Sequence, residues 1–116
     1  MRKSKEPYRY RLQHIMDAIS KIEIISKDLT RDEFISDITA SSAVCYQFLI
    51  IGEAIASLPA EITDKYKYPW YKPRTFRNFL AHEYLGVDLI MVYDTINKDL
   101  PELGQLIDRM ISDMQP

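Results

Sequence analysis

Apolar residues recur every three or four positions along much of this chain, which is the spacing of a helix that buries one face. A first stripe, between about residue 7 and residue 27, consists of Leu12, Ile15, Ile19 and Ile22. A second stripe, between residues 37 and 58, consists of Val44, Phe48, Ile51, Ile55 and Leu58 and is widened by Leu49, Ile50 and Ala54. Because the second stripe covers more than one side of its helix, we expect that helix to lie centrally, with neighbours on several sides.

Cap and turn residues predict where these helices begin and end. Pro7 is acceptable in a first helical turn. Thr30 with Glu33 matches a capping box, in which each side chain accepts a hydrogen bond from a free backbone N–H of the other residue. We therefore expect a helix to start just after Thr30. Pro59 ends the second long helix. Residues 60–72 lack sustained periodicity and predict an irregular connection with room for one short turn.

Three further helical segments follow. Pro73 fits a helix start, residues 75–85 form the body of that helix, and Gly86 suits its C-cap. Asp88 can cap the next helix, which ends near Pro101. The last two segments carry apolar residues at helical spacing, namely Leu89, Val92, Ile96, Leu103, Ile107, Met110 and Met114.

These segments predict an all-α fold, an up-and-down bundle of about five helices joined by short loops. No strand-like alternation is sustained in the sequence, and only 3 glycines occur, which is few for a turn-rich β fold. The 116 residues suit a single domain spanning residues 1–116.

Charge and cysteine content narrow the function classes. A net charge of -2 and a pI near 5.6 argue against a general nucleic-acid coat protein, which relies on many phosphate contacts, but allow an enzyme that binds one phosphate locally. The single cysteine, Cys45, lies in an apolar run, which indicates a packed thiol rather than a nucleophile. No signal peptide and no stretch of membrane-spanning length is apparent, so we expect a cytoplasmic protein without membrane contacts.

The chain has two histidines, and their surroundings differ. His14 stands alone in the first helix, where a partly buried or surface histidine is expected. His82 lies in the segment Arg77-Asn78-Phe79-Leu80-Ala81-His82-Glu83-Tyr84. We find no metal-ligand spacing, no glycine-rich phosphate loop and no nucleophile elbow, so we predict no metal and no cofactor.

The segment around His82 contains the parts of a metal-free ribonuclease. A helix places Asn78 below His82 and Tyr84 near Arg77, with Arg77 and His82 about 140° apart. Arg77 can bind a phosphate, His82 can move a proton, and Asn78 can orient the imidazole. One such histidine cannot easily make both proton transfers, so this chemistry predicts a homodimer with a shared cleft. An ordinary solvated helix face remains the alternative explanation of the same spacing.

Basic and aromatic residues alternate just upstream, between Lys65 and Arg74. This pattern suits phosphate contact and base stacking, and we assign RNA or phosphate binding to Lys72 and Arg74. The alternative is that Trp70 and the tyrosines anchor an irregular loop to the core.

The motif Arg77-x4-His82-x-Tyr84, together with Gly52-Glu53-Ala54, Pro69-Trp70 and Gly86-x-Asp88, resembles the HepT-like branch of the HEPN superfamily over nearly the whole chain. The resemblance implies a HEPN-like helical homodimer and a metal-independent endoribonuclease acting on tRNA or mRNA. It also implies the toxin of a type VII-like toxin–antitoxin pair, whose partner is a minimal nucleotidyltransferase.

For the residues, the resemblance implies that Arg77 and His82 are catalytic, that Asn78 and Tyr84 support them, and that Tyr84 accepts AMP from ATP. The position of Glu53 implies support of the cleft rather than catalysis. Two alternatives stay open: a non-catalytic nucleotide-binding or adaptor subunit of a nucleotidyltransferase complex, and a helical interaction protein without a site.

Overall fold

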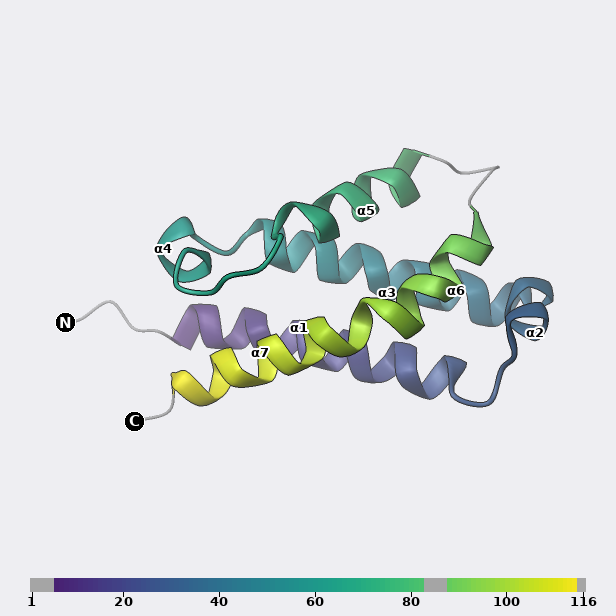
Figure 1. Ribbon diagram of the computed structural model, residues 1–116, viewed down its shortest axis with the longest axis horizontal. Coiled ribbons are helices and arrows are strands. Elements are labelled where there is room, and N and C mark those ends of the chain that lie inside the picture. Colours follow the sequence, from purple (N-terminus) through teal and green to yellow (C-terminus); the bar gives the residue numbers. More distant parts are fainter. Residues whose placement is uncertain (1–5, 83–87, 115–116) are drawn as a thin grey trace.

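The computed structural model describes residues 6–82 and 88–114. For residues 6 and 7 it describes the backbone alone. Over this part of the chain it contains seven helices and no strand (Figure 1). They are α1 (Glu6–Ser26), α2 (Arg31–Ser36), α3 (Ile38–Ala56), α4 (Ala60–Thr63), α5 (Tyr71–His82), α6 (Leu89–Lys98) and α7 (Leu100–Asp113). The predicted all-α class is confirmed. The difference from the expected five helices lies in α2 and α4, which have only 6 and 4 residues.

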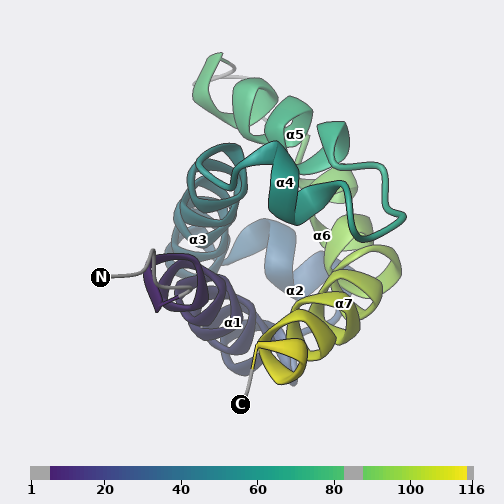
Figure 2. The same ribbon diagram turned by 90° about the vertical axis from the view of Figure 1, so that its left-hand side faces the viewer.

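The long helices alternate in direction, as expected for an up-and-down bundle. α1 and α3 lie antiparallel, α5 runs back along α3, and α6 and α7 together return along the other side (Figure 1). The molecule is elongated, with extents of 51 × 28 × 23 Å. Seen end-on, α5 stands at the outer edge of the bundle (Figure 2), and its main contact is with α3.

The predicted caps are present. Glu33 N donates to the hydroxyl of Thr30 at 3.2 Å, while Thr30 N donates to the carboxylate of Glu33 at 2.9 Å, so the capping box is confirmed. The carboxylate of Asp88 accepts from Met91 N at 3.2 Å at the start of α6. Each bond satisfies a backbone amide that has no partner within its own helix.

α3 packs against three other helices, α1, α2 and α5, in line with the expectation of several neighbours. It contacts α1 and α5, and its buried apolar residues, including Val44, Phe48, Ile51 and Ile55, belong to one stripe. Its 19 residues are long and apolar enough to cross a bilayer, which corrects the expectation that no stretch approaches that length. Packing inside the bundle accounts for only part of this composition, because 39% of the apolar window is buried.

The connection between α3 and α5 is more ordered than its sequence suggested. α5 begins at Tyr71, ahead of the predicted start at Pro73, which lies buried within the first turn where a missing N–H costs nothing. The indole N–H of Trp70 donates to the carbonyl oxygens of Thr63 and Tyr66, both at 3.1 Å. Trp70 is therefore an anchor of this segment, the simpler of the two alternatives. The predicted C-cap Gly86 lies outside the described residues.

Candidate functional site

Helix α5 carries all but one of the residues predicted to form the site. These are Lys72, Arg74, Arg77, Asn78 and His82. Tyr84, the predicted AMP acceptor, lies outside the described residues. Because one short helix holds these five residues, the relative positions of their side chains follow from helical geometry and from what α5 packs against.

Arg77 is held by two partners. Its NH1 donates to Oε2 of Glu53 on α3 at 3.1 Å, forming an ion pair. Its Nε and NH2 both donate to Oδ1 of Asn78, at 3.2 and 3.0 Å. The Arg77 side chain is only 21% exposed, whereas that of Glu53 is 73% exposed. A guanidinium has five N–H groups, so these contacts leave two N–H groups for a phosphate while fixing the plane of the group.

Gly52 explains how Arg77 comes so close to α3. A Cβ atom placed on Gly52 would lie 2.4 Å from the Cβ of Arg77 and 3.1 Å from the backbone oxygen of Pro73. Any other residue at this position would push α5 away from α3. The absence of a side chain at Gly52 thus sets the distance across which Glu53 reaches Arg77.

His82 lies apart from this arrangement. Its side chain is exposed at the last described position of α5, about 140° around the helix from Arg77, which faces α3. The amide of Asn78 was expected to orient the imidazole, but its oxygen accepts from Arg77 instead. No hydrogen bond joins Asn78 to His82, both of which are described. The two candidate catalytic groups therefore do not meet within one chain.

Lys72 and Arg74 are both exposed, but they lie on different sides of α5. Two positions along a helix are about 200° apart, so the two cations cannot contact the same phosphate easily. Lys72 lines a cavity of about 440 Å³, whereas Arg74 does not. Binding of RNA or phosphate by Lys72 and Arg74 stays a prediction, for two separate contacts rather than one.

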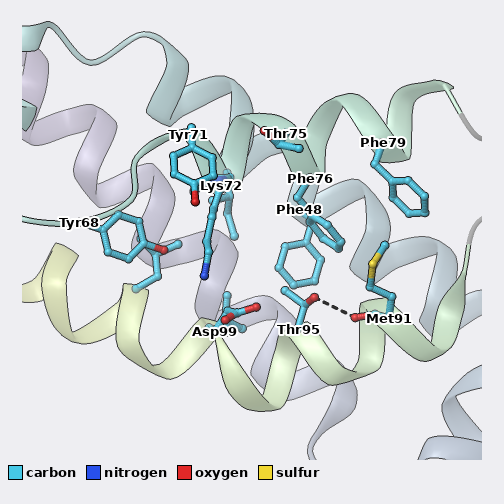
Figure 3. Close-up of a pocket in the computed structure, with 14 residues that line it drawn as sticks. Phe48, Tyr68, Tyr71, Lys72, Thr75, Phe76, Phe79, Met91, Thr95 and Asp99 are labelled. Atoms are coloured by element: carbon cyan, nitrogen blue, oxygen red, sulfur yellow. Dashed lines mark hydrogen bonds between the residues drawn. The ribbon is translucent and has the colours of Figure 1, made fainter.

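The cavity lies between α5 and the α6–α7 side of the bundle (Figure 3). Its wall is mostly apolar, and its aromatic members are Phe48, Tyr68, Tyr71, Phe76 and Phe79. Burial, together with the nearby carboxylates of Glu102 and Asp99, raises the pKa of Tyr68 to about 12. Tyr68 is therefore a neutral hydrogen-bond donor at ordinary pH.

Two other candidates have structural roles. Cys45 is half-buried, and burial raises the pKa of its thiol, which supports a packed cysteine rather than a nucleophile. His14 is exposed, and its ring lies 4.4 Å from that of Tyr10. Across residues 6–82 and 88–114, no three His, Cys, Asp or Glu side chains lie close enough together to hold a metal ion.

Sequence reasoning missed two features of this region. One is the ion pair between Glu53 and Arg77, for which the Gly52-Glu53 pair was the available signal. The other is the cavity, whose aromatic residues come from α3, α5 and the segment before α5. Phe48 was recognised only as a core residue, and nothing in its spacing indicates that its ring borders an opening.

Comparison with known proteins gives a consistent result. The family model described as "Ribonuclease HepT-like" matches residues 15–110. The chain is 36% identical over 115 residues to a Methanocaldococcus jannaschii protein named "Gamma-glutamylcyclotransferase and putative RNase". That match covers 98% of this chain and 50% of the other protein, so this chain spans half of that protein's length.

Two shorter relatives are matched along nearly their whole length. A "Putative RNase" of Caldanaerobacter subterraneus subsp. tengcongensis is 32% identical, over 94% of this chain and 96% of that protein. A "Probable ribonuclease HepT" of Thermococcus cleftensis is 31% identical, over 95% of this chain and 98% of that protein. No solved structure matches the chain significantly.

Proposed function

We propose that this chain, which belongs to the HepT-like ribonuclease family, is a metal-independent endoribonuclease with Arg77 and His82 as its catalytic residues. The observation that carries the proposal is the fixed guanidinium of Arg77. Glu53 and Asn78 hold it, and two of its N–H groups remain for a phosphate oxygen. His82 is exposed on the same helix, where it can reach a bound substrate.

The proposed reaction is an internal phosphoryl transfer. Neutral His82 takes the proton of a ribose 2′-hydroxyl, whose oxygen attacks the adjacent phosphorus. The bond from phosphorus to the 5′-oxygen breaks, and a protonated imidazole supplies the proton that the leaving oxygen needs. The products are a 2′,3′-cyclic phosphate and a free 5′-hydroxyl. Arg77 stabilises the negative charge that builds on the phosphate oxygens in the transition state.

The two proton transfers lead us to propose a homodimer. One His82 can act as base while the His82 of a second copy acts as acid, across a cleft that both chains line. A groove between α1 and α3 suits the contact, because it has an apolar floor that includes Leu49 and Ile50, and Glu53 lies at its edge. Tyr46, at the same groove, is 61% exposed. A second copy packed there would bury this apolar surface beside Arg77.

We further propose that the protein is the toxin of a type VII-like toxin–antitoxin pair and acts on tRNA or mRNA in the cytoplasm. A minimal nucleotidyltransferase would inactivate it by transferring AMP from ATP to Tyr84. Each AMP would add a negative charge seven residues from Arg77 in the sequence, where it would compete with the RNA phosphate. Expression with and without the neighbouring nucleotidyltransferase, followed by mass spectrometry of the Tyr84 peptide, tests this part.

An RNA cleavage assay in the presence of EDTA tests the ribonuclease itself. We expect wild-type protein to release fragments ending in a 2′,3′-cyclic phosphate, and His82→Ala and Arg77→Ala to lose this activity. Arg31→Ala, at the exposed start of α2, is the matched control and should cleave normally. Cleavage by His82→Ala at the wild-type rate would refute the assignment. ATP or AMP binding by a chain that cuts no RNA would favour the non-catalytic adaptor alternative.

A further inference from the structure

The aromatic cavity beside α5 has no part in the proposed reaction. It has a volume of about 440 Å³ and opens to solvent between α5 and the α6–α7 side of the bundle (Figure 3). α5 packs mainly on α3, so this space is not closed by helix packing. Tyr71 at its edge is 61% exposed and Met91 is 36% exposed. An open apolar pocket with a few polar groups is the usual form of a small-ligand site.

The rings of the cavity present faces and edges to a planar ligand. Phe76 and Phe79 lie nearly parallel, with an interplanar angle of 20° and 6.2 Å between ring centres. The ring of Phe48 meets Phe76 edge-on at 5.0 Å. Nucleobases stack on such side chains, and each stacked base contributes about 1–3 kcal/mol.

Two charged groups of opposite sign lie at the mouth of the cavity. The side chain of Lys72 extends from α5 toward the carboxylate of Asp99 (Figure 3). Asp99 is the N-cap residue of α7, yet its side chain makes no capping hydrogen bond, unlike those of Asp37 and Asp88. Its carboxylate is therefore free to accept hydrogen bonds from a ligand in the cavity.

This pair of groups matches one base edge. The Watson–Crick edge of guanine carries the acceptor O6 next to two donors, N1–H and N2–H₂. Lys72 can donate to O6 while the carboxylate of Asp99 accepts from both donors. Adenine, cytosine and uracil each present a ring or carbonyl acceptor where guanine has one of these donors. That acceptor would face the carboxylate of Asp99, and the two would repel.

We propose that this cavity is a nucleobase subsite, which holds one unpaired guanine of the RNA bound along α5. The proposal rests on the ribonuclease function proposed above. Phe79 and His82 are three residues apart and lie next to each other on the helix surface. Lys72 lies ten residues before His82, roughly 15 Å along the axis. The guanine therefore belongs to a nucleotide that flanks the cleaved phosphate rather than to the reacting nucleotide itself.

Trp70 gives a direct readout of binding. It is the only tryptophan of the chain, and its ring lies 5.0 Å from that of Tyr68 in the cavity wall. The probes are two 2′-O-methyl pentanucleotides, UUGUU and UUAUU, which lack the attacking hydroxyl and are not cut. We expect UUGUU to change Trp70 fluorescence and to bind about tenfold or more tightly than UUAUU, as a good bidentate contact to a base allows.

Asp99→Asn should weaken binding of UUGUU about tenfold and should strengthen binding of UUAUU, because the uncharged amide no longer repels the ring acceptor of adenine and can donate to it. Asp108→Asn, an exposed position of α7 outside the cavity wall, is the matched control and should behave as wild type. Equal binding of the two probes, or an Asp99→Asn variant that keeps the preference for UUGUU, would overturn the guanine site. So would RNA cleavage by wild-type protein without any response of Trp70 to either probe.

The cleavage assay separates this inference from the function on which it rests. Selective binding of UUGUU by a protein that cuts no RNA would refute the ribonuclease while the guanine site stands. Cleavage at sites with no neighbouring guanine, at a rate that Asp99→Asn does not alter, would refute the guanine site while the ribonuclease stands.

Discussion

The contact between Gly52 and Arg77 gives the sharpest prediction for this fold. In Gly52→Ala, the new methyl group would lie 2.4 Å from the Cβ of Arg77. A Cβ of the neighbouring helix cannot rotate away, so α5 itself must retreat from α3. Ordinary van der Waals contact begins at 3.4 Å, which requires a retreat of about 1 Å.

The expected cost follows from two opposing effects. Overpacking of a helix interface costs about 1–3 kcal/mol, because packed groups such as Phe48 and Phe76 lose contact. Replacing a glycine by alanine within a helix raises the free energy of unfolding by up to about 1 kcal/mol, because alanine has the higher helix propensity. We expect a net loss of roughly 1–2 kcal/mol in the free energy of unfolding, and a melting temperature lower by about 4–8 °C for a chain of this size.

Gly104→Ala is the matched control. Gly104 lies within α7, and a Cβ there would meet only Ile19 Cγ2 at 3.8 Å, an ordinary contact. This variant should gain about 0.5–1 kcal/mol from helix propensity alone, so the two glycine variants should shift the melting temperature in opposite directions. Thermal unfolding followed by circular dichroism measures both. A Gly52→Ala protein as stable as wild type would show that α5 does not pack as closely as described.

Three other changes test the site and its surroundings. Glu53→Ala should lower RNA cleavage about 10- to 100-fold by releasing Arg77, yet change the free energy of unfolding by less than about 1 kcal/mol, because the Glu53 side chain is 73% exposed. Kinetics and melting on the same sample check both. The thiol of Cys45, whose pKa burial raises, should react with iodoacetamide much more slowly in the native protein than in urea, as intact-mass spectrometry would record. Burial and the hydrogen bond to Asp113 raise the pKa of Tyr66 to about 12, from an ordinary value of 10. The stabilisation of the folded protein by protonated Tyr66 is fully present below pH 10 and is lost as the pH rises through 12. The free energy of unfolding in urea should therefore change less between pH 10 and 12 for Tyr66→Phe than for the wild type.

Much of the fold could be predicted because its signals are local. Apolar spacing identified the long helices, and capping chemistry identified Thr30 and Asp88 as helix starts. The start of α5 was misplaced because Pro73 looked like a first residue, whereas it occupies a later position of the same first turn. The anchoring of Trp70 depends on carbonyl oxygens of Thr63 and Tyr66, which the sequence pattern does not reveal.

The site was predictable in its residues but not in its contacts. Helical geometry alone separated Arg77 from His82, and the structure has them on different sides of α5. The partner of Asn78 could not be predicted, because the Arg77 guanidinium that donates to its oxygen is also held by the pull of Glu53. That pull depends on the close approach at Gly52, which is a tertiary feature.

The two sides of α5 together restrict where an RNA strand can lie. Arg77 faces α3 on one side, and Lys72 lines the cavity on the other. The surface that joins them is the exposed face of α5, which carries Thr75, Asn78 and His82. A strand that contacts both Arg77 and the cavity must therefore cross this face, and His82 lies five residues beyond Arg77 on the same helix. Because Arg77 and Lys72 belong to the same helix, α5 itself sets the distance between the two contacts. The interface with α3, at which Gly52 leaves no free space, sets where that helix lies.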